Sequence, residues 1–146
     1  MTDVAIETFA KIGGHGEIVR KLYEVRLALP DVGFSSFHSA DGVHYSHAAV
    51  VARIQGKIVG IISYDTLEYN QSIFIYTGWV DPEHRRKGIY RQLIGKLKEI
   101  AAEKNVVRIT GSTAFNNNDM QAVMTKLGRR PVAIVYEMDL NDAGDK

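Results

Sequence analysis

Three basic residues, Arg85, Arg86 and Lys87, stand directly before Gly88 and a segment with helical periodicity. The start of a helix carries unpaired N–H groups and the positive end of the helix dipole, and both attract anions. Gly88 has no Cβ, so a phosphate can approach its backbone closely. The pattern therefore indicates a phosphate site, with a solvated helix face as the alternative because such basic turns are common.

The histidine spacing and the lack of cysteine argue against metal sites and thiol chemistry in this chain. His38, His44 and His47 stand close together, but their spacing matches no metal-ligand pattern, so we expect exposed loop histidines and no metal site. The absence of cysteine excludes disulfides, thiolate metal ligands and a cysteine nucleophile.

Apolar periodicity predicts the elements that would position the basic turn. The expected strands are residues 2–9, 48–54, 58–65, 73–80, 106–110 and 131–140. Two helices are expected at residues 17–28 and 89–104, and a third between an asparagine-rich cap at 116–119 and Gly128. Segment 31–46 is irregular and is expected to hold substrate contacts. The hairpins must be antiparallel, whereas the strands on either side of the helix at 89–104 must be parallel. The sheet is therefore mixed.

Length and charge narrow the class of protein. The chain of 146 residues fits one domain, expected over 1–140 with a polar tail at 141–146. The net charge of +1 argues against a nucleic-acid partner. Because neither an apolar run of membrane-spanning length nor a signal-peptide pattern is present, we expect a cytoplasmic protein without membrane contact.

Two motifs in this order resemble the GNAT N-acetyltransferase superfamily. The first is Val80-Asp81-Pro82 followed by Arg85-Arg86-Lys87-Gly88-Ile89-Tyr90, and the second places Asn117, Met120, Leu127 and Gly128 on a capped helix that ends at glycine. The resemblance covers nearly the whole chain. It implies an α/β (α+β) fold with a mixed, mostly antiparallel central sheet flanked by helices, and with a splayed parallel strand pair at the cofactor site.

The same resemblance implies a cofactor, acetyl-CoA or another short acyl-CoA, and a set of residues that bind it. Backbone N–H groups would hold the pyrophosphate, with the Arg85 side chain assisting. The pantetheine arm would lie between the splayed strands, along the strand edge near Trp79 and Val80. The implied cofactor-binding residues are Trp79, Val80, Arg85, Arg86, Lys87, Gly88, Ile89, Tyr90 and Asn117.

Three positions depart from the family pattern. Tyr90 stands where the first motif ends in glycine or alanine, and its side chain can point away from the phosphate. Met124 stands where relatives often carry a tyrosine that protonates the leaving thiolate, and Arg129 replaces an aromatic residue. Because a thiol has a pKa of about 8.5, the thiolate is a fair leaving group, and we expect slower rather than abolished transfer.

Catalytic candidates beyond the cofactor site remain open. Glu68 and Asp65 could serve as the base, although turn and surface charge is the alternative for both. Tyr76 and Tyr136 could line the acceptor channel or belong to the core. We take Glu68 and Tyr136 as the catalytic candidates.

These observations favour an N-acetyltransferase that acts on a primary amine of a small molecule or a protein. The alternative is an acyl-CoA-binding module with weak or no transfer, serving regulation or interaction, which Met124 keeps open. Nucleic-acid binding by the basic patch is the weakest interpretation. A homodimer is compatible with the resemblance, and nothing in the sequence tests it.

Overall fold

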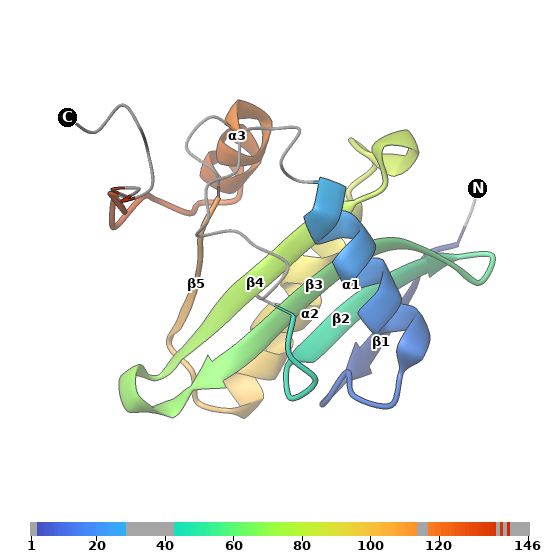
Figure 1. The fold of residues 1–146 in the computed structure, drawn as a ribbon, viewed down its shortest axis with the longest axis horizontal. Coiled ribbons are helices and arrows are strands. Elements are labelled where there is room, and N and C mark those ends of the chain that lie inside the picture. The colour runs from blue at the N-terminus through green and yellow to red at the C-terminus, as the bar shows by residue number, and fades with distance from the viewer. Residues whose placement is uncertain (1–2, 29–42, 114–116, 137, 139, 141–146) are drawn as a thin grey trace.

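A five-stranded mixed sheet forms the centre of the computed structural model, which describes residues 3–28, 43–113, 117–136, 138 and 140 (Figure 1). The strands lie in chain order, and each neighbouring pair is antiparallel except the last, β4 with β5. Their bounds are β1 Ala5–Phe9, β2 Ala48–Ile54, β3 Lys57–Leu67, β4 Ser72–Val80 and β5 Arg108–Gly111. The mixed, mostly antiparallel sheet expected from the sequence is confirmed.

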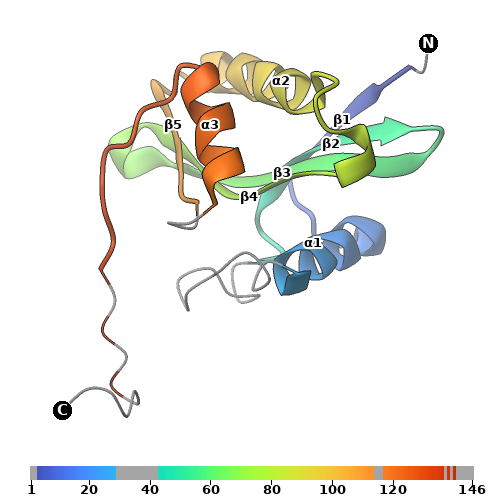
Figure 2. The ribbon, with the colours of Figure 1, turned by 90° about the horizontal axis from the view of Figure 1, so that it is seen from above.

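Helices cover both faces of this sheet (Figure 2). Helix α1 (Gly16–Ala28) lies on one face and α2 (Ile89–Glu103) on the other, and α3 (Asn118–Lys126) follows β5. Because successive side chains of a strand point to opposite faces, β2 contributes Val51 to the cluster with α1 and Val50 to the cluster with α2.

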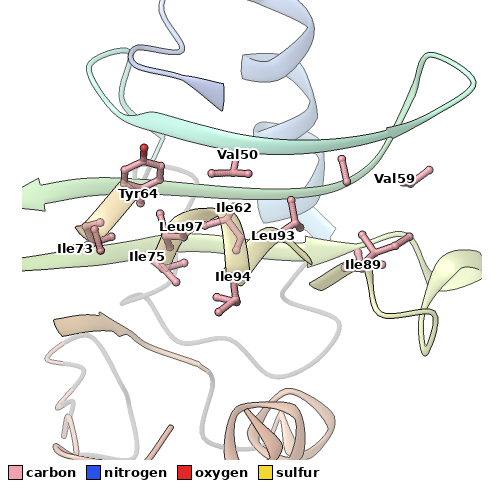
Figure 3. Packing of buried hydrophobic residues seen from close by; sticks show 13 residues of the cluster. Val50, Val59, Ile62, Tyr64, Ile73, Ile75, Ile89, Leu93, Ile94 and Leu97 are labelled. Carbon is pink, nitrogen blue, oxygen red and sulfur yellow. The ribbon is translucent and has the colours of Figure 1, made fainter. Parts of the chain in front are cut away.

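The cluster beneath α2 holds the larger part of the core (Figure 3). Leu93 and Leu97 of α2 are fully buried against Ile62 and Ile73 of the sheet. Each such side chain contributes about 1.5–3 kcal/mol by leaving water. This packing fixes α2 on the sheet and thereby fixes where its first turn stands.

Strand β5 is shorter than β4 and pairs with it over its whole length. The pairing runs from Ser72 with Arg108 to Ile75 with Gly111, where β5 ends. On the other edge of β4, the register with β3 shifts between Ser63 and Tyr64, which leaves Tyr76 as an extra residue. Such bulges increase local twist. The parallel strand pair that the resemblance implied is present, and beyond Ile75 this edge of β4 has no strand partner among the described residues.

The strand predicted at 131–140 is wrong. In the part of this segment that is described, residues 131–136 lie outside any helix or strand and run away from the sheet (Figure 2). Its large apolar side chains are exposed: Val132, Ile134, Val135, Tyr136, Met138 and Leu140. Alternation predicts which faces a strand would present, but a strand also needs a neighbour for its backbone hydrogen bonds. No described strand offers that neighbour here.

Two further predictions from the sequence fall partly outside the described residues. Segment 31–46 is described only from Val43, and the tail at 141–146 is not described. None of the described helices combines the length and the apolar content that crossing a membrane requires.

Candidate functional site

A small cavity of about 60 Å³ lies beside β4 at the point where β5 ends. Strand β4 lines it with Tyr76, Thr77 and Gly78, and the end of β5 faces them with Gly111. The remaining walls come from Ile75, from α1, from α2, from the two residues after β5, and from α3 with its N-cap and the segment that follows it: Val25, Arg26, Tyr90, Ser112, Thr113, Asn117, Met120, Met124 and Arg129. Five elements distant in sequence therefore meet at this end of β5.

The turn that leads into α2 is exposed through Gly88, whereas Ile89, the first residue of the helix, is buried. Gly88 caps the helix with φ of 80°, a left-handed conformation that glycine adopts without strain, and a Cβ there would meet nothing within 4 Å. The first intrahelical bond runs from the Gln92 N–H to the Gly88 carbonyl oxygen at 3.1 Å. The N–H groups of Ile89, Tyr90 and Arg91 precede that bond and have no intrahelical acceptor. Such a turn can receive an anion.

One of the three basic residues before Gly88 is hydrogen-bonded to the sheet. Arg85, Arg86 and Lys87 are exposed, but Arg85 Nε donates to the Val80 carbonyl oxygen at 3.0 Å. This bond ties the turn to the end of β4. Arg86 adopts φ of 64°, which turns the chain sharply before the helix. The turn is thus held close to the strand edge that leads into the cavity.

Trp79 and Val80 contribute little side-chain surface to this edge. Trp79 packs against the cluster under α1, with Lys21 Nζ 4.9 Å from its ring centroid. Val80 is buried in the cluster under α2. Their side chains are core, so a pantetheine arm would meet β4 mainly through backbone groups.

Asn117 and Met124 both line the cavity from α3. Asn117 caps the helix, since its Oδ1 accepts from the Met120 N–H at 3.2 Å. Met124 brings no proton donor to the cavity, because a thioether carries no acidic hydrogen.

The side chain of Tyr90 extends from α2 into the cavity. Its ring lies over Gly78, where a Cβ would stand 3.2 Å from both Tyr90 Cε2 and the hydroxyl oxygen. Burial raises the pKa of Tyr90, while the charge of Arg129 and its hydrogen bond to the hydroxyl act to lower it. Glycine at 78 therefore makes room for the bulky side chain that departs from the family motif.

A buried polar cluster behind β4 was missed by the sequence reasoning. Arg26 is 5% exposed, and its Nη1 donates to the Tyr76 carbonyl oxygen at 2.7 Å and to Thr77 Oγ1 at 2.9 Å. Its burial could have been predicted, because Arg26 stands four residues after the buried Leu22 on α1 and residues four apart share a helix face. Arg26 secures the bulged part of β4 that lines the cavity.

His47 belongs to the same cluster, which corrects the expectation of an exposed loop histidine. It is 4% exposed, and its ring stacks on Tyr76 with centroids 4.1 Å apart and planes at 15°. Burial is the main cause that lowers the pKa of His47; His44 and Arg26 lower it further, and Asp65 opposes them. The burial of His47 could have been predicted from its position directly before the apolar strand β2. His44 is exposed as expected, and His38 lies outside the described residues.

Glu68 and Tyr136 lie apart from the cavity. Glu68 stands in the exposed turn Glu68–Asn70 between β3 and β4, and Tyr136 is 88% exposed. Neither is among the described residues that line the cavity. Their catalytic roles stay predictions. Within the described part of the chain, no group of histidine, aspartate or glutamate side chains is arranged to hold a metal ion.

Comparisons with known proteins agree with this geometry. The family model described as the acetyltransferase (GNAT) family matches residues 19–128, more than half of the chain. None of the curated proteins compared matches the sequence.

Solved structures share the fold at low sequence identity. An aminoglycoside N-acetyltransferase, AAC(6')-Iy in complex with CoA, is 19% identical with a TM-score of 0.67, and the match covers 97% of each chain. A ribosomal-protein-alanine N-acetyltransferase from Brucella melitensis biovar Abortus 2308 is 19% identical with a TM-score of 0.65, over 94% of this chain and 100% of that chain. At these identities the likeness supports the fold alone.

Proposed function

The chain belongs to the acetyltransferase (GNAT) family, and we propose that it transfers an acetyl group from acetyl-CoA, or another short acyl-CoA, to a primary amine of a small molecule or a protein. One observation carries this proposal: the exposed turn at Gly88 leads into α2, whose Tyr90 lines the cavity beside β4 at the end of β5. A diphosphate on that turn would direct a thioester arm along the unpaired edge of β4.

The residues at the turn fit a diphosphate. Arg86 and Lys87 are exposed, and the space over Gly88 is open. Charge-assisted hydrogen bonds are each worth about 1.5–3 kcal/mol. A few of them, after the cost of association, give an affinity in the micromolar range, about −8 kcal/mol.

Acetyl-CoA, when bound, supplies the thioester carbonyl carbon that the amine attacks. The protein must then hold the amine neutral, because an alkyl ammonium has a pKa of about 10.4 and no free electron pair. Unpaired backbone N–H groups on the edge of β4 suit the oxyanion that forms. For the base we keep the candidate Glu68, which would act through water because it does not line the cavity, and for the acceptor channel we keep Tyr136.

The cofactor site can be tested with Gly88→Glu. We expect this variant to lose CoA binding by at least about tenfold, because a carboxylate would repel the diphosphate and occupy its space. Gly56→Glu is the matched control: Gly56 has the same φ of 80° and open surroundings, but it lies in the hairpin turn between β2 and β3. Both variants carry the same backbone strain, so titration calorimetry with CoA isolates the site. Equal affinity in the two variants would place the diphosphate elsewhere.

The alternative of a binding module without transfer has a specific observation in its favour, since Met124 lines the cavity in place of a proton donor. Release of free thiol from acetyl-CoA in the presence of a panel of amines distinguishes the two functions. A module would bind CoA and gain thermal stability from it, yet release no thiol with any amine.

A further inference from the structure

Tyr90 brings the phenol of α2 into the cavity, in place of the small residue that ends the family motif. Its hydroxyl lies against Gly78 of β4, three residues past the last pairing of β4 with β5 at Ile75. Met124 lines the same cavity. Tyr90 and the position on α3 at which relatives often carry a tyrosine therefore line one cavity.

Arg129 approaches the phenol from the opposite wall. Its Nη2 lies 3.3 Å from where a Cβ of Gly111 would stand, so the guanidinium extends over the end of β5. Its Nη1 is buried and has no hydrogen-bond partner among the described residues. Gly78 and Gly111 leave the space in which the two side chains meet.

We propose that the Tyr90 hydroxyl is the general acid that protonates the departing coenzyme A thiolate, and that Arg129 is the residue that positions it. This inference rests on the proposed function. An arm that ran from the turn at Gly88 along β4 would pass Gly78, against which the Tyr90 hydroxyl lies. A positive charge beside the phenol stabilises the phenolate that remains after the proton leaves.

Atoms and electrons balance in this step. The amine nitrogen forms a bond to the carbonyl carbon, and the carbon–sulfur bond breaks with its electron pair on sulfur. The Tyr90 O–H proton passes to sulfur, and a proton lost by the amine returns through water to the phenolate. The products are an amide and a thiol, and no oxidant or further reactant is needed.

Two residues of β4 also bring hydroxyl groups to the cavity. Thr77 Oγ1 accepts from Arg26, and the ring of Tyr76 is stacked on His47. Tyr76 is the rival donor because it is the other phenol that lines the cavity. The experiment therefore replaces each of the two tyrosines with phenylalanine in turn.

The test measures thiol release from acetyl-CoA with the best amine of the panel, or with hydroxylamine as a small strong nucleophile. We expect Tyr90→Phe to lower kcat by about tenfold or more, within the range that general acids contribute, while the KM for acetyl-CoA and the affinity for CoA change less than about twofold. Met124→Tyr in the Tyr90→Phe background should restore part of kcat, because it returns a phenol to the same cavity. Tyr64→Phe is the matched control, since Tyr64 is buried in the cluster under α2 and does not line the cavity.

Three results would overturn the assignment. The first is an unchanged kcat in Tyr90→Phe. The second is a loss of kcat and CoA affinity in parallel, which indicates a binding role. The third is a loss confined to Tyr76→Phe. If the wild-type protein binds CoA but acetylates neither the amines nor hydroxylamine, the proposed function itself fails, and the assignment fails with it.

Discussion

Two glycines and the residues around them shape the site at the scale of single side chains. Gly88 holds a left-handed conformation at the start of α2 with open space around it. Gly78 instead gives room to the ring of Tyr90. One glycine therefore leaves open space at the start of α2, and the other leaves space for a side chain that lines the cavity.

His47 leads to a prediction about stability and pH. Its pKa is lowered in the folded protein, mainly by burial, whereas an unfolded histidine has a pKa of about 6.5. Below that pH the unfolded chain binds more protons than the folded chain, so stability is complete above about pH 6.5 and falls as the pH falls toward the folded pKa. One such histidine changes the free energy of unfolding by at most about 1.4 kcal/mol per pH unit.

Urea denaturation between about pH 7.5 and 5.5 checks this expectation. We expect His47→Gln to be less stable at the upper pH, because the stacking on Tyr76 is lost, but to lose less stability on acidification than the wild type. His15→Gln, at an exposed position, serves as the control for the remaining histidines. Parallel pH curves for wild type and His47→Gln would contradict the prediction.

Helix α2 has two roles at the scale of elements. Its buried face, with Leu93 and Leu97, fixes it on the sheet, and its first turn presents free N–H groups beside β4. The bulge at Tyr76 lies directly after the point on β4 where the pairing with β5 ends. The site therefore depends on the relative positions of three elements.

A substitution on the exposed face of α2 should strengthen the helix without touching the site. Gly95 lies in the helix interior and is exposed, and a Cβ added there would meet nothing within 4 Å. Gly95→Ala is expected to stabilise the protein by about 0.5–1 kcal/mol, because alanine loses less backbone entropy than glycine.

Thermal or urea unfolding measures this gain, and CoA affinity should stay unchanged. Gly14→Ala is the contrasting control: Gly14 is equally uncrowded, but its φ of 90° is unfavourable for alanine, so the protein should be destabilised. A destabilised Gly95→Ala variant would mean that the outer face of α2 has a contact that its exposure does not indicate.

At the scale of the whole molecule, two apolar clusters lie on the two faces of the sheet, and residues 131–136 belong to neither. Their exposed side chains include Val132, Ile134 and Tyr136. Exposed apolar surface of this extent often marks a protein–protein contact. This feature supports the expectation of a homodimer, which neither the fold nor the family establishes.

Light scattering after size-exclusion chromatography tests that expectation. The wild-type protein should run at twice the chain mass, and the double change Ile134→Ser with Tyr136→Ser should shift it toward the monomer, because less apolar area is removed from water. Leu27→Ser is the control, since Leu27 is exposed on α1. A monomeric wild-type protein at high concentration would contradict the homodimer.

The sequence by itself determined the features that depend on neighbours along the chain. The periodicity of α2, the hairpin between β2 and β3, and the basic turn at Gly88 were all predicted close to their observed bounds. Local backbone preferences and the burial pattern of a single element are enough for such features. Two motifs in order were then enough to indicate the family.

Only the tertiary structure decided which side chains meet beside β4. Arg26 reaches Thr77, His47 stacks on Tyr76, and Tyr90 covers Gly78, although each pair is far apart in the chain or on different elements. Such contacts depend on strand register and on how helices sit across the sheet, and a one-residue shift would move every side chain to the other face. The strand predicted at 131–140 is wrong for the same reason. Alternating apolar residues can be read from the segment itself, but a strand forms only where a neighbouring strand accepts and donates its backbone hydrogen bonds.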